Sequence, residues 1–549
     1  MRDRDPDEVS LVTSVFDQCG GTERGKLRLM VLDRRVCDRA RQSRDARFDG
    51  RFFIAVTTTG IYCRPICPVR APKDEHVRYF PSAAAAEAAG FRPCLRCRPE
   101  ASPGTPAWLG TSGIVSRALR LISEGALDQH GVERLADRVG VTDRHLRRLF
   151  VQHLGATPLD VALTRRAHFA KKLLDETTLS CSRIADAAGF GSLRRFNGHM
   201  RRVYDRTPTE LRGLRRPHAV TDPDCYRFRL AYRPPFDWNA MLAFLRARAT
   251  PGVESVDESC YRRTISVEGK HGAVTVSRLD SGDALALDVR FPEPRSLLFI
   301  VERVRRMFDL GADPRVIRQH LRSDPLLVNL VKKHPGIRVP GAWDGFELAV
   351  RAILGQQIAV RAATTIAGRV AALFGSSIAD DLLLRPGRLF PTPVQLASAP
   401  LERAGVVPAR AETIRSLARR VADGTLALDT CVRGRVVAPP RTDPGRRSAS
   451  SASPAPSGAP TVRIVHGGVQ RDDAQSGLRA IPGIGAWTAE YIAMRAFGEP
   501  DAFPSGDLVL RRTTGARTAR ELERRSQAWR PWRAYAVMLL WGSACAPVL

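Results

Sequence analysis

The chain has 549 residues, enough for roughly three or four domains of ordinary size, each with its own core. Its 86 Lys and Arg residues outnumber its 57 Asp and Glu residues, and the formal net charge of +29 favours a polyanionic partner such as nucleic acid. A GC-biased genome also raises Arg, Ala, Gly and Pro content, so charge alone leaves the partner open.

The same sequence argues against a membrane or secreted protein. No run reaches the roughly 18 apolar residues of a membrane span, and MRDRDPDEVS at the start lacks the apolar segment of a secretory signal. The eleven cysteines do not form the pattern of a disulfide framework. We expect a cytoplasmic, nucleoid-associated protein that binds double-stranded DNA and no membrane.

The first predicted domain spans residues 30–105 and follows a tail, residues 1–29, that is expected to be disordered. It is predicted to be a small α+β unit, because FFIAV is typical of a strand and AAAAEAAG of a short helix ended by glycine. Two close cysteine pairs in it, with gaps of three, twenty-six and two residues, predict one tetrahedral zinc site; its ligands are Cys63, Cys67, Cys94 and Cys97. From spacing alone a purely structural staple is the commoner interpretation.

Residues 110–216 show helical periodicity and an internal repeat. Each copy has a short helix ended by a glycine and a second helix after a turn, which predicts an all-α domain with two helix-turn-helix units. An ordinary helical bundle with a solvated basic face is the alternative, which the repetition of the turn disfavours. The polar residues on the outer faces of the second helices are the predicted DNA contacts: Arg144, Arg147, Arg148, Arg194, Arg195 and Asn197.

The last part of the chain is predicted to be an α+β unit. Alternating strands around glycine turns predict a small antiparallel sheet over residues 226–291, and helices dominate residues 292–549. An insertion rich in Arg, Pro, Ser, Ala and Gly, about residues 433–468, is expected to be disordered. The predicted fold class is therefore multidomain, with an α+β zinc domain, an all-α domain, and a sheet joined to a helical domain.

The segment LRAIPGIGAWTAEYIAM is typical of a helix-hairpin-helix motif. We predict that Gly483 and Gly485 contact DNA there, because glycines let backbone amides approach a phosphate. About twenty residues further on lies Asp507, where a helix N-cap is the simpler interpretation. A carboxylate held there also suits base excision, which needs one beside the anomeric carbon. Aromatic side chains would hold the extruded, cationic base, although burial in a core is the usual fate of such residues; the candidates are Trp487, Tyr491, Trp541 and Trp238.

These motifs resemble two known families. TTTGIYCRPIC and AGFRPCLRC resemble the zinc domain of Ada, and residues 114–214 resemble the AraC-type DNA-binding domain that follows it. YRPPFDWNAMLAFLRARA, FELAVRAILGQQ and PGIGAWTAEYIAMRA resemble the AlkA-type DNA-3-methyladenine glycosylases. The chain thus looks like a fusion of the Ada regulatory half with an AlkA-type glycosylase.

The resemblance to Ada implies that Cys63 accepts a methyl group from a DNA methylphosphotriester, while the other three cysteines only hold zinc. Loss of one negative charge at the centre would then tighten DNA binding and activate transcription, with RNA polymerase as a further partner. A structural zinc module without methyl transfer is the alternative.

The resemblance to AlkA implies that Asp507 is the catalytic aspartate. Trp487 stands where lyase-active relatives carry a Lys nucleophile, which implies a monofunctional DNA-3-methyladenine glycosylase II without an organic cofactor. Gln357 stands where some AlkA proteins carry a Leu that wedges into DNA. The alternative is a transcription regulator whose glycosylase part binds DNA without excising bases.

Overall fold

The computed structural model describes residues 33–103, 113–123, 125–128, 130–214, 224–378, 387–428 and 471–544. The expected tail at residues 1–29 and the expected insertion at residues 433–468 lie outside the described residues. Within those described ranges, no helix is long and apolar enough to cross a membrane.

The N-terminal unit is a four-stranded sheet of order β3-β1-β2-β4 with a helix on each face. Side chains alternate along β1, so Ile54 packs with α1 in one small core while Phe53 and Ala55 pack with α2 in another. The elements are α1 (Arg34–Gln42), β1 (Phe53–Val56), β2 (Ile61–Cys63), β3 (Val77–Phe80), α2 (Ala83–Ala88) and β4 (Arg92–Pro93). Three 3-10 turns complete the unit: η1 (Ala46–Phe48), η2 (Asp74–His76) and η3 (Pro99–Ala101).

The next seven helices form the two predicted helix-turn-helix units. The turn in each begins with a glycine in the left-handed region, Gly140 at φ +75° and Gly189 at φ +77°, and a Thr142 or Ser192 side chain caps the following helix. The helices are α3 (Gly113–Ser123), α4 (Val132–Arg138), α5 (Asp143–Leu154), α6 (Pro158–Glu176), α7 (Cys181–Ala187), α8 (Leu193–Tyr204) and α9 (Pro208–Gly213). The long helix α6 connects the two units.

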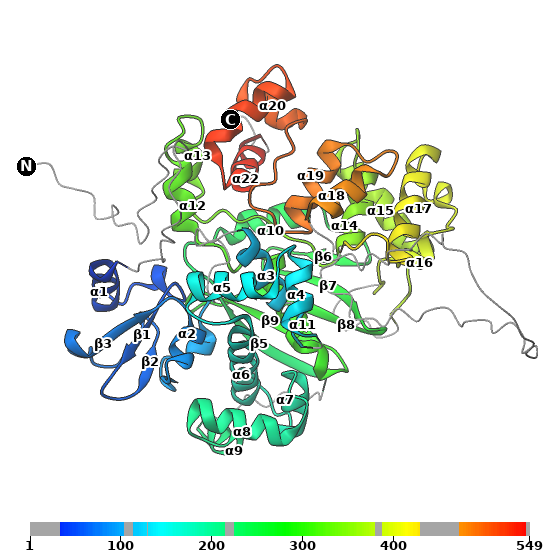
Figure 1. Cartoon of the computed structure of the whole chain (residues 1–549). Coiled ribbons are helices and arrows are strands. Elements are labelled where there is room, and N and C mark those ends of the chain that lie inside the picture. Colours follow the sequence, from blue (N-terminus) through cyan, green and yellow to red (C-terminus); the bar gives the residue numbers. More distant parts are fainter. Residues whose placement is uncertain are drawn as a thin grey trace, which may run out of the picture.

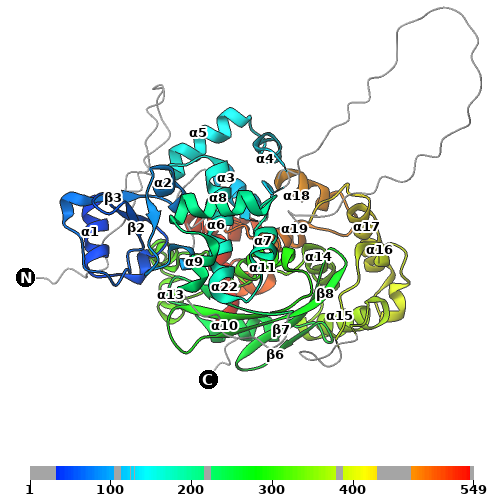
Figure 2. The same ribbon diagram turned by 90° about the horizontal axis from the view of Figure 1, so that it is seen from below.

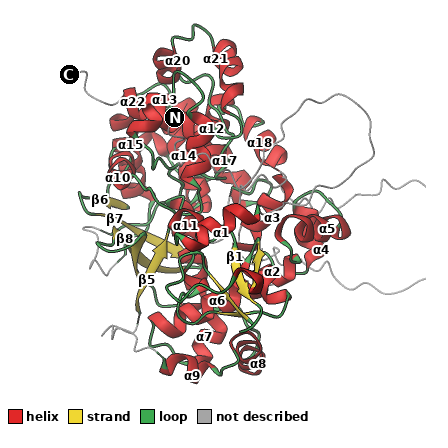
Figure 3. Ribbon diagram, turned by 90° about the vertical axis from the view of Figure 1, so that its left-hand side faces the viewer, coloured by secondary structure: helices red, strands yellow, loops and turns green. Residues whose placement is uncertain are grey.

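The second sheet has the order β5-β9-β8-β7-β6, and all its neighbours pair antiparallel. Its strands are β5 (Cys225–Ala231), β6 (Glu254–Val256), β7 (Cys260–Val267), β8 (Lys270–Arg278) and β9 (Ala284–Arg290), and Figure 3 shows that it is separate from the first sheet. One apolar core runs from α6 and α8 through this sheet to α10 (Trp238–Arg246) and α11 (Leu297–Met307), with η4 (Pro294–Ser296) before α11. Because that core crosses from the helix-turn-helix units into the sheet, the domain limits stay predictions.

The remaining helices enclose two more cores, and α19 (Ala486–Arg495) contributes to both: Ala489 and Ile492 to one, Ala493 and Met494 to the other. This helix therefore lies at the seam of the helical part. The other elements are α12 (Pro314–Leu321), α13 (Val328–Lys333), α14 (Gly345–Leu354), α15 (Val360–Phe374), α16 (Pro393–Leu396), η5 (Leu401–Ala404), α17 (Pro408–Ala422), α18 (Arg471–Arg479), α20 (Leu508–Thr514), α21 (Ala519–Arg525), η6 (Ser526–Trp529) and α22 (Arg533–Ala544).

The two ends of the molecule differ in content. The sheet of β1 to β4 lies at one end and helices α15 to α17 lie at the other, with the helix-turn-helix units between them (Figures 1 and 2). The architecture agrees with the predicted fold class: a small α+β unit, an all-α unit, and an antiparallel sheet joined to a helical domain.

Candidate functional site

The four predicted zinc ligands meet at the edge of the first sheet. Parallel pairing of β2 with β4, with Tyr62 opposite Pro93, brings the end of one strand beside the start of the second cysteine pair. The four sulfur atoms lie within 4.8 Å of one another, and the four cysteines are only 6 to 8% exposed. Backbone hydrogen bonds fix the loops, from the Cys94 N–H to the Tyr62 carbonyl (2.9 Å) and from the Cys67 N–H to the Arg64 carbonyl (3.1 Å).

The chemistry of this donor set fits zinc. Hydrogen bonds among the four sulfurs raise the pKa of Cys63 and of Cys97 and lower the pKa of Cys94, because neighbouring thiols in a buried site cannot all ionise by themselves. A divalent cation removes that conflict, and four sulfurs at close range match its tetrahedral preference.

The side chain of Arg64 lies beside the four cysteines. This residue was not among the predicted site residues, although it directly follows Cys63. The Arg64 N–H lies 3.3 Å from the Cys97 sulfur, and its guanidinium donates to the Cys97 carbonyl (3.0 Å) and to an Asp49 carboxylate oxygen (2.8 Å). The guanidinium is therefore held by protein oxygens at the rim of the cluster.

The predicted DNA-contacting side chains of the helix-turn-helix units lie on the outer faces of α5 and α8. All are exposed except the half-buried Arg147, which is held by Asp143 in the preceding turn (2.8 Å). Arg148 lies 3.0 Å from a ring nitrogen of His145. The two faces therefore offer arginine side chains to a partner, as the sequence predicts, while a contact with DNA stays a prediction.

Asp507 is both an N-cap and a group held by indoles. One carboxylate oxygen accepts hydrogen bonds from the Leu510 N–H (2.9 Å) and from the Trp541 indole (3.2 Å), and the other accepts from the Trp487 indole (3.0 Å). The residue is 9% exposed. The two interpretations of the sequence are thus compatible, because the helix entrance orients a carboxylate that two aromatic residues also grip.

Three of the four predicted aromatic residues lie together around this carboxylate. The Trp487 and Tyr491 rings are stacked at 5.3 Å with an interplanar angle of 8°, and Trp541 lies 6.2 Å from Tyr491. All three are half-buried, and the stacking of Trp487 on Tyr491 covers one face of each of these two rings. Trp238 is placed apart: it is 5% exposed and stacks on Phe308 at 5.7 Å in the core behind the sheet. No ring contact among the described residues joins it to the other three, and we omit it from the site.

Tyr491 is surrounded by arginines on its hydroxyl side. Arg495 donates a hydrogen bond to that hydroxyl (2.8 Å), and Arg248 and Arg351 lie close enough to act on it. Burial raises the pKa of Tyr491, but the three cations outweigh burial and the net pKa is lowered. The Arg495 guanidinium also lies over the Tyr491 ring, 5.6 Å from its centroid, so the same cation contacts both the ring and the hydroxyl.

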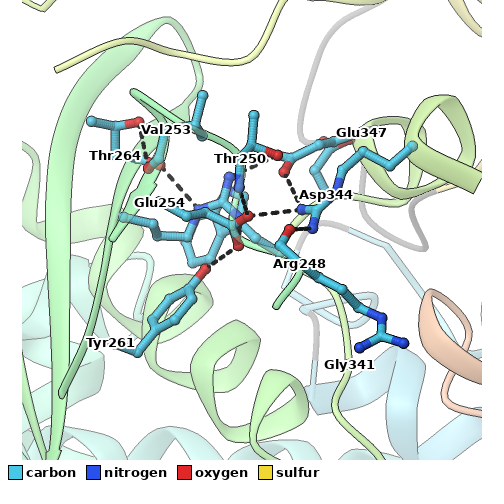
Figure 4. A network of polar contacts seen from close by, with 12 residues as sticks. Arg248, Thr250, Val253, Glu254, Tyr261, Thr264, Gly341, Asp344 and Glu347 are labelled. Atoms are coloured by element: carbon cyan, nitrogen blue, oxygen red, sulfur yellow. Dashed lines mark hydrogen bonds and ion pairs between the residues drawn. The ribbon is translucent and has the colours of Figure 1, made fainter. Parts of the chain in front are cut away.

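A buried ionic network attaches helix α14 to strands β6 and β7 of the second sheet (Figure 4). Glu254 of β6 accepts hydrogen bonds from the Tyr261 hydroxyl (2.7 Å) and from Arg351 of α14 (2.9 Å). Arg351 also contacts Glu347 (3.0 Å), which accepts a hydrogen bond from Arg263 of β7 (2.7 Å). Two carboxylates and two guanidinium groups balance one another, so the network fixes α14, which ends at Leu354, three positions before Gln357.

The predicted hairpin and wedge have unusual backbone geometry. Gly483 has φ +91°, and Gly485 is the N-cap of α19 without a side chain of its own. Gln357 is exposed and has φ +57°, a region that a residue with a side chain occupies only when its surroundings hold it there. The chain thus presents a strained, outward-facing residue beside a glycine hairpin.

Comparisons with known proteins follow the same division of the chain. A family model for the metal binding domain of Ada matches residues 36–100, one for a helix-turn-helix domain matches residues 135–213, and one for the AlkA N-terminal domain matches residues 227–344. The fold and the sites therefore define a protein in which an Ada-type zinc and helix-turn-helix half precedes an AlkA-type half, and the predicted fusion is confirmed.

The chain is 40% identical over 522 residues to the probable bifunctional transcriptional activator/DNA repair enzyme AlkA of Mycobacterium tuberculosis (strain ATCC 25618 / H37Rv), covering 93% of this chain and 97% of that protein. The chain therefore belongs to the family of this bifunctional transcriptional activator/DNA repair enzyme AlkA. It is also 31% identical over 318 residues to DNA-3-methyladenine glycosylase 2 of Escherichia coli (strain K12), covering 57% of this chain and 96% of that enzyme. The chain binds one zinc ion through its four clustered cysteines, and DNA is its partner.

Proposed function

We propose that this protein responds to DNA alkylation in three ways. It accepts a methyl group from DNA methylphosphotriesters on Cys63, activates transcription through its helix-turn-helix units with RNA polymerase as a partner, and excises alkylated bases of the 3-methyladenine type. The observation that supports base excision best is the carboxylate of Asp507, held between the indoles of Trp487 and Trp541.

The methyl transfer assigned to Cys63 is a substitution at carbon. Zinc, when bound, keeps the sulfur as a thiolate at neutral pH. The Cys63 sulfur forms a bond to the methyl carbon while the bond from that carbon to the phosphotriester oxygen breaks, and the phosphodiester leaves as an anion. The thiolate becomes a neutral thioether, so the cluster loses one negative charge and repels the DNA backbone less.

Base excision uses the group around Asp507. The glycosidic bond breaks with its electron pair going to the cationic base, which leaves as a neutral base, and the carboxylate stabilises the positive charge that develops on the sugar. Water then attacks the anomeric carbon and releases a proton to the solvent, which leaves an abasic sugar. The electron-rich rings of Trp487, Tyr491 and Trp541, all half-buried beside this carboxylate, attract a cationic alkylated base. Because the side chain beside the carboxylate is an indole and not an amine, no Schiff base forms there, and the proposed reaction is hydrolysis alone.

An excision assay on methylated duplex DNA, which counts abasic sites, tests the glycosylase. We expect Asp507→Asn to lower the excision rate by about 10²-fold or more, since it removes the charge and keeps the shape. Asp237→Asn is the matched control, because Asp237 also caps a helix, α10, through the Ala240 N–H (3.1 Å). Full activity of Asp507→Asn would overturn the assignment.

A wild-type protein that binds methylated DNA and excises no base would support a different function, that of a transcription regulator alone. The two outcomes are separated by running binding and excision on the same oligonucleotide. The three hydrogen bonds to Asp507 favour the enzyme, because a residue that only caps a helix has no need of two indole donors.

A further inference from the structure

The loop between α14 and α15 and the glycine hairpin before α19 are tied together by one side chain. The Gln356 side-chain amide donates hydrogen bonds to the Gly483 carbonyl (2.9 Å) and to the Thr488 hydroxyl (3.0 Å), although 127 and 132 residues separate these partners. Both of its N–H groups are thus used within the protein. The next residue along the chain is the exposed Gln357.

Helix α17 braces both parts from behind. Arg410 donates to the Gln356 carbonyl (2.5 Å), and the Thr413 hydroxyl donates to the Pro482 carbonyl (2.9 Å). Thr413 also approaches the hairpin so closely that a Cβ on Gly483 would lie 2.2 Å from its hydroxyl oxygen. The loop and the hairpin therefore both hydrogen-bond to α17, and the Gln356 amide joins them directly to each other.

We propose that Gln356 is a positioning residue for base extrusion, which sets the register between Gln357 and the hairpin that holds the DNA backbone. This inference rests on the glycosylase function proposed above. Gln356 itself touches neither the base nor the sugar. Its second partner, Thr488, directly follows Trp487, so the same amide also fixes the start of the helix that carries the aromatic site.

The physical argument is one of register. Extruding a paired base costs a few kcal/mol, and that cost is smaller for a base that is already unpaired. A wedge and a backbone clamp can drive extrusion only if their spacing matches the DNA, and a displacement of about 1 Å costs up to about 10²-fold in rate. A loosened loop should therefore penalise a paired base more than an unpaired one, whereas damage to the catalytic group penalises both equally.

Gln356→Met tests this, because methionine keeps the length of the side chain and loses both donors. We expect excision of an alkylated base to fall about 10-fold or more when the base is paired, and less than about 3-fold when it lies opposite an abasic site. Thr488→Val, which removes one acceptor, should give a smaller effect in the same direction. Gln527→Met is the matched control, since the Gln527 side-chain amide donates to Glu523 within its own turn.

A second measurement works without catalysis. In the Asp507→Asn background, the fluorescence of 2-aminopurine placed opposite the target base reports extrusion, and Gln356→Met should reduce its rise by about the same factor as the excision of the paired base. The inference would be overturned if Gln356→Met lost excision equally on the paired and the unpaired base. It would also be overturned if Gln356→Met left the fluorescence rise unchanged, or if protein with Gln356 intact gave no rise at all. If extrusion is seen but wild-type protein excises nothing, the proposed glycosylase function fails and the positioning role stands.

Discussion

At the scale of single residues, Cys63 is not distinguished from its three neighbours by burial or by distance, since all four sulfurs share one small site. Its assignment as methyl acceptor depends on its place in TTTGIYCRPIC. After exposure to DNA with a methylphosphotriester, we expect a peptide containing Cys63 to gain about 14 Da, as thiolate alkylation requires. Mass spectrometry measures this, with Cys37 as an internal control, because burial raises the pKa of that thiol to about 12. A gain on another cysteine would contradict the assignment.

Asp309 offers a test of stability against pH. Burial raises its pKa to about 6, and the cation of Arg338 only partly offsets this. The folded state therefore holds the proton of Asp309 more tightly than the unfolded chain does, because the ordinary pKa of an Asp carboxyl is 3.8. The stability that this group contributes is full below pH about 4 and is lost as the pH rises through about 6. We expect Asp309→Asn to match wild type near pH 4 and to be more stable, by up to about 3 kcal/mol, at pH 7.5 in urea unfolding; equal pH dependence in both proteins would refute this.

At the scale of elements, the hairpin before α19 should depend on Gly483 far more than on Gly485. An alanine at position 483 would adopt φ +91° and would place its Cβ against Thr413, whereas a Cβ at position 485 meets no atom within 4 Å. We expect Gly483→Ala to lose about 2–4 kcal/mol of unfolding free energy and Gly485→Ala about 1 kcal/mol or less, because alanine is a poorer N-cap than glycine. Urea unfolding followed by circular dichroism compares them. Equal losses would show that the hairpin geometry is not set by this contact.

The elements also show what the sequence could predict. Cysteine spacing, glycines at helix ends and the caps at Thr142 and Ser192 are local signals, because the residues that make each feature lie within a few positions of one another. Trp238 could not be placed this way: its neighbour Phe308 is seventy positions further on, and only packing brings the rings together. The hydrogen bonds of the Gln356 amide could not be predicted for the same reason, because their partners lie 127 and 132 positions away.

At the scale of the whole molecule, the regulatory and glycosylase halves share a buried contact. Arg120 of α3 donates to the carbonyls of Phe497 (2.8 Å) and Gly498 (3.1 Å) and to the Glu499 carboxylate (2.8 Å). These three residues lie in the connection from α19, which carries Tyr491, to Asp507 at the start of α20. Only 19% of the Arg120 side chain and 8% of the Glu499 side chain are exposed, so water screens this pair weakly.

A second buried pair joins the zinc unit to the same half, since Arg51 lies 3.0 Å from Asp313, the N-cap of α12. Because these contacts and the core that runs from α6 into the second sheet cross between the halves, we expect the described units to unfold together. Arg120→Glu would set its carboxylate against that of Glu499, cost roughly 2–4 kcal/mol and lower the temperature of the calorimetric unfolding transition. Arg134→Glu is the matched control, since Arg134 is exposed on α4 and its guanidinium lies 3.3 Å from a ring nitrogen of His130. An unchanged transition temperature in Arg120→Glu would show that the Arg120 contact contributes nothing to holding the two halves together.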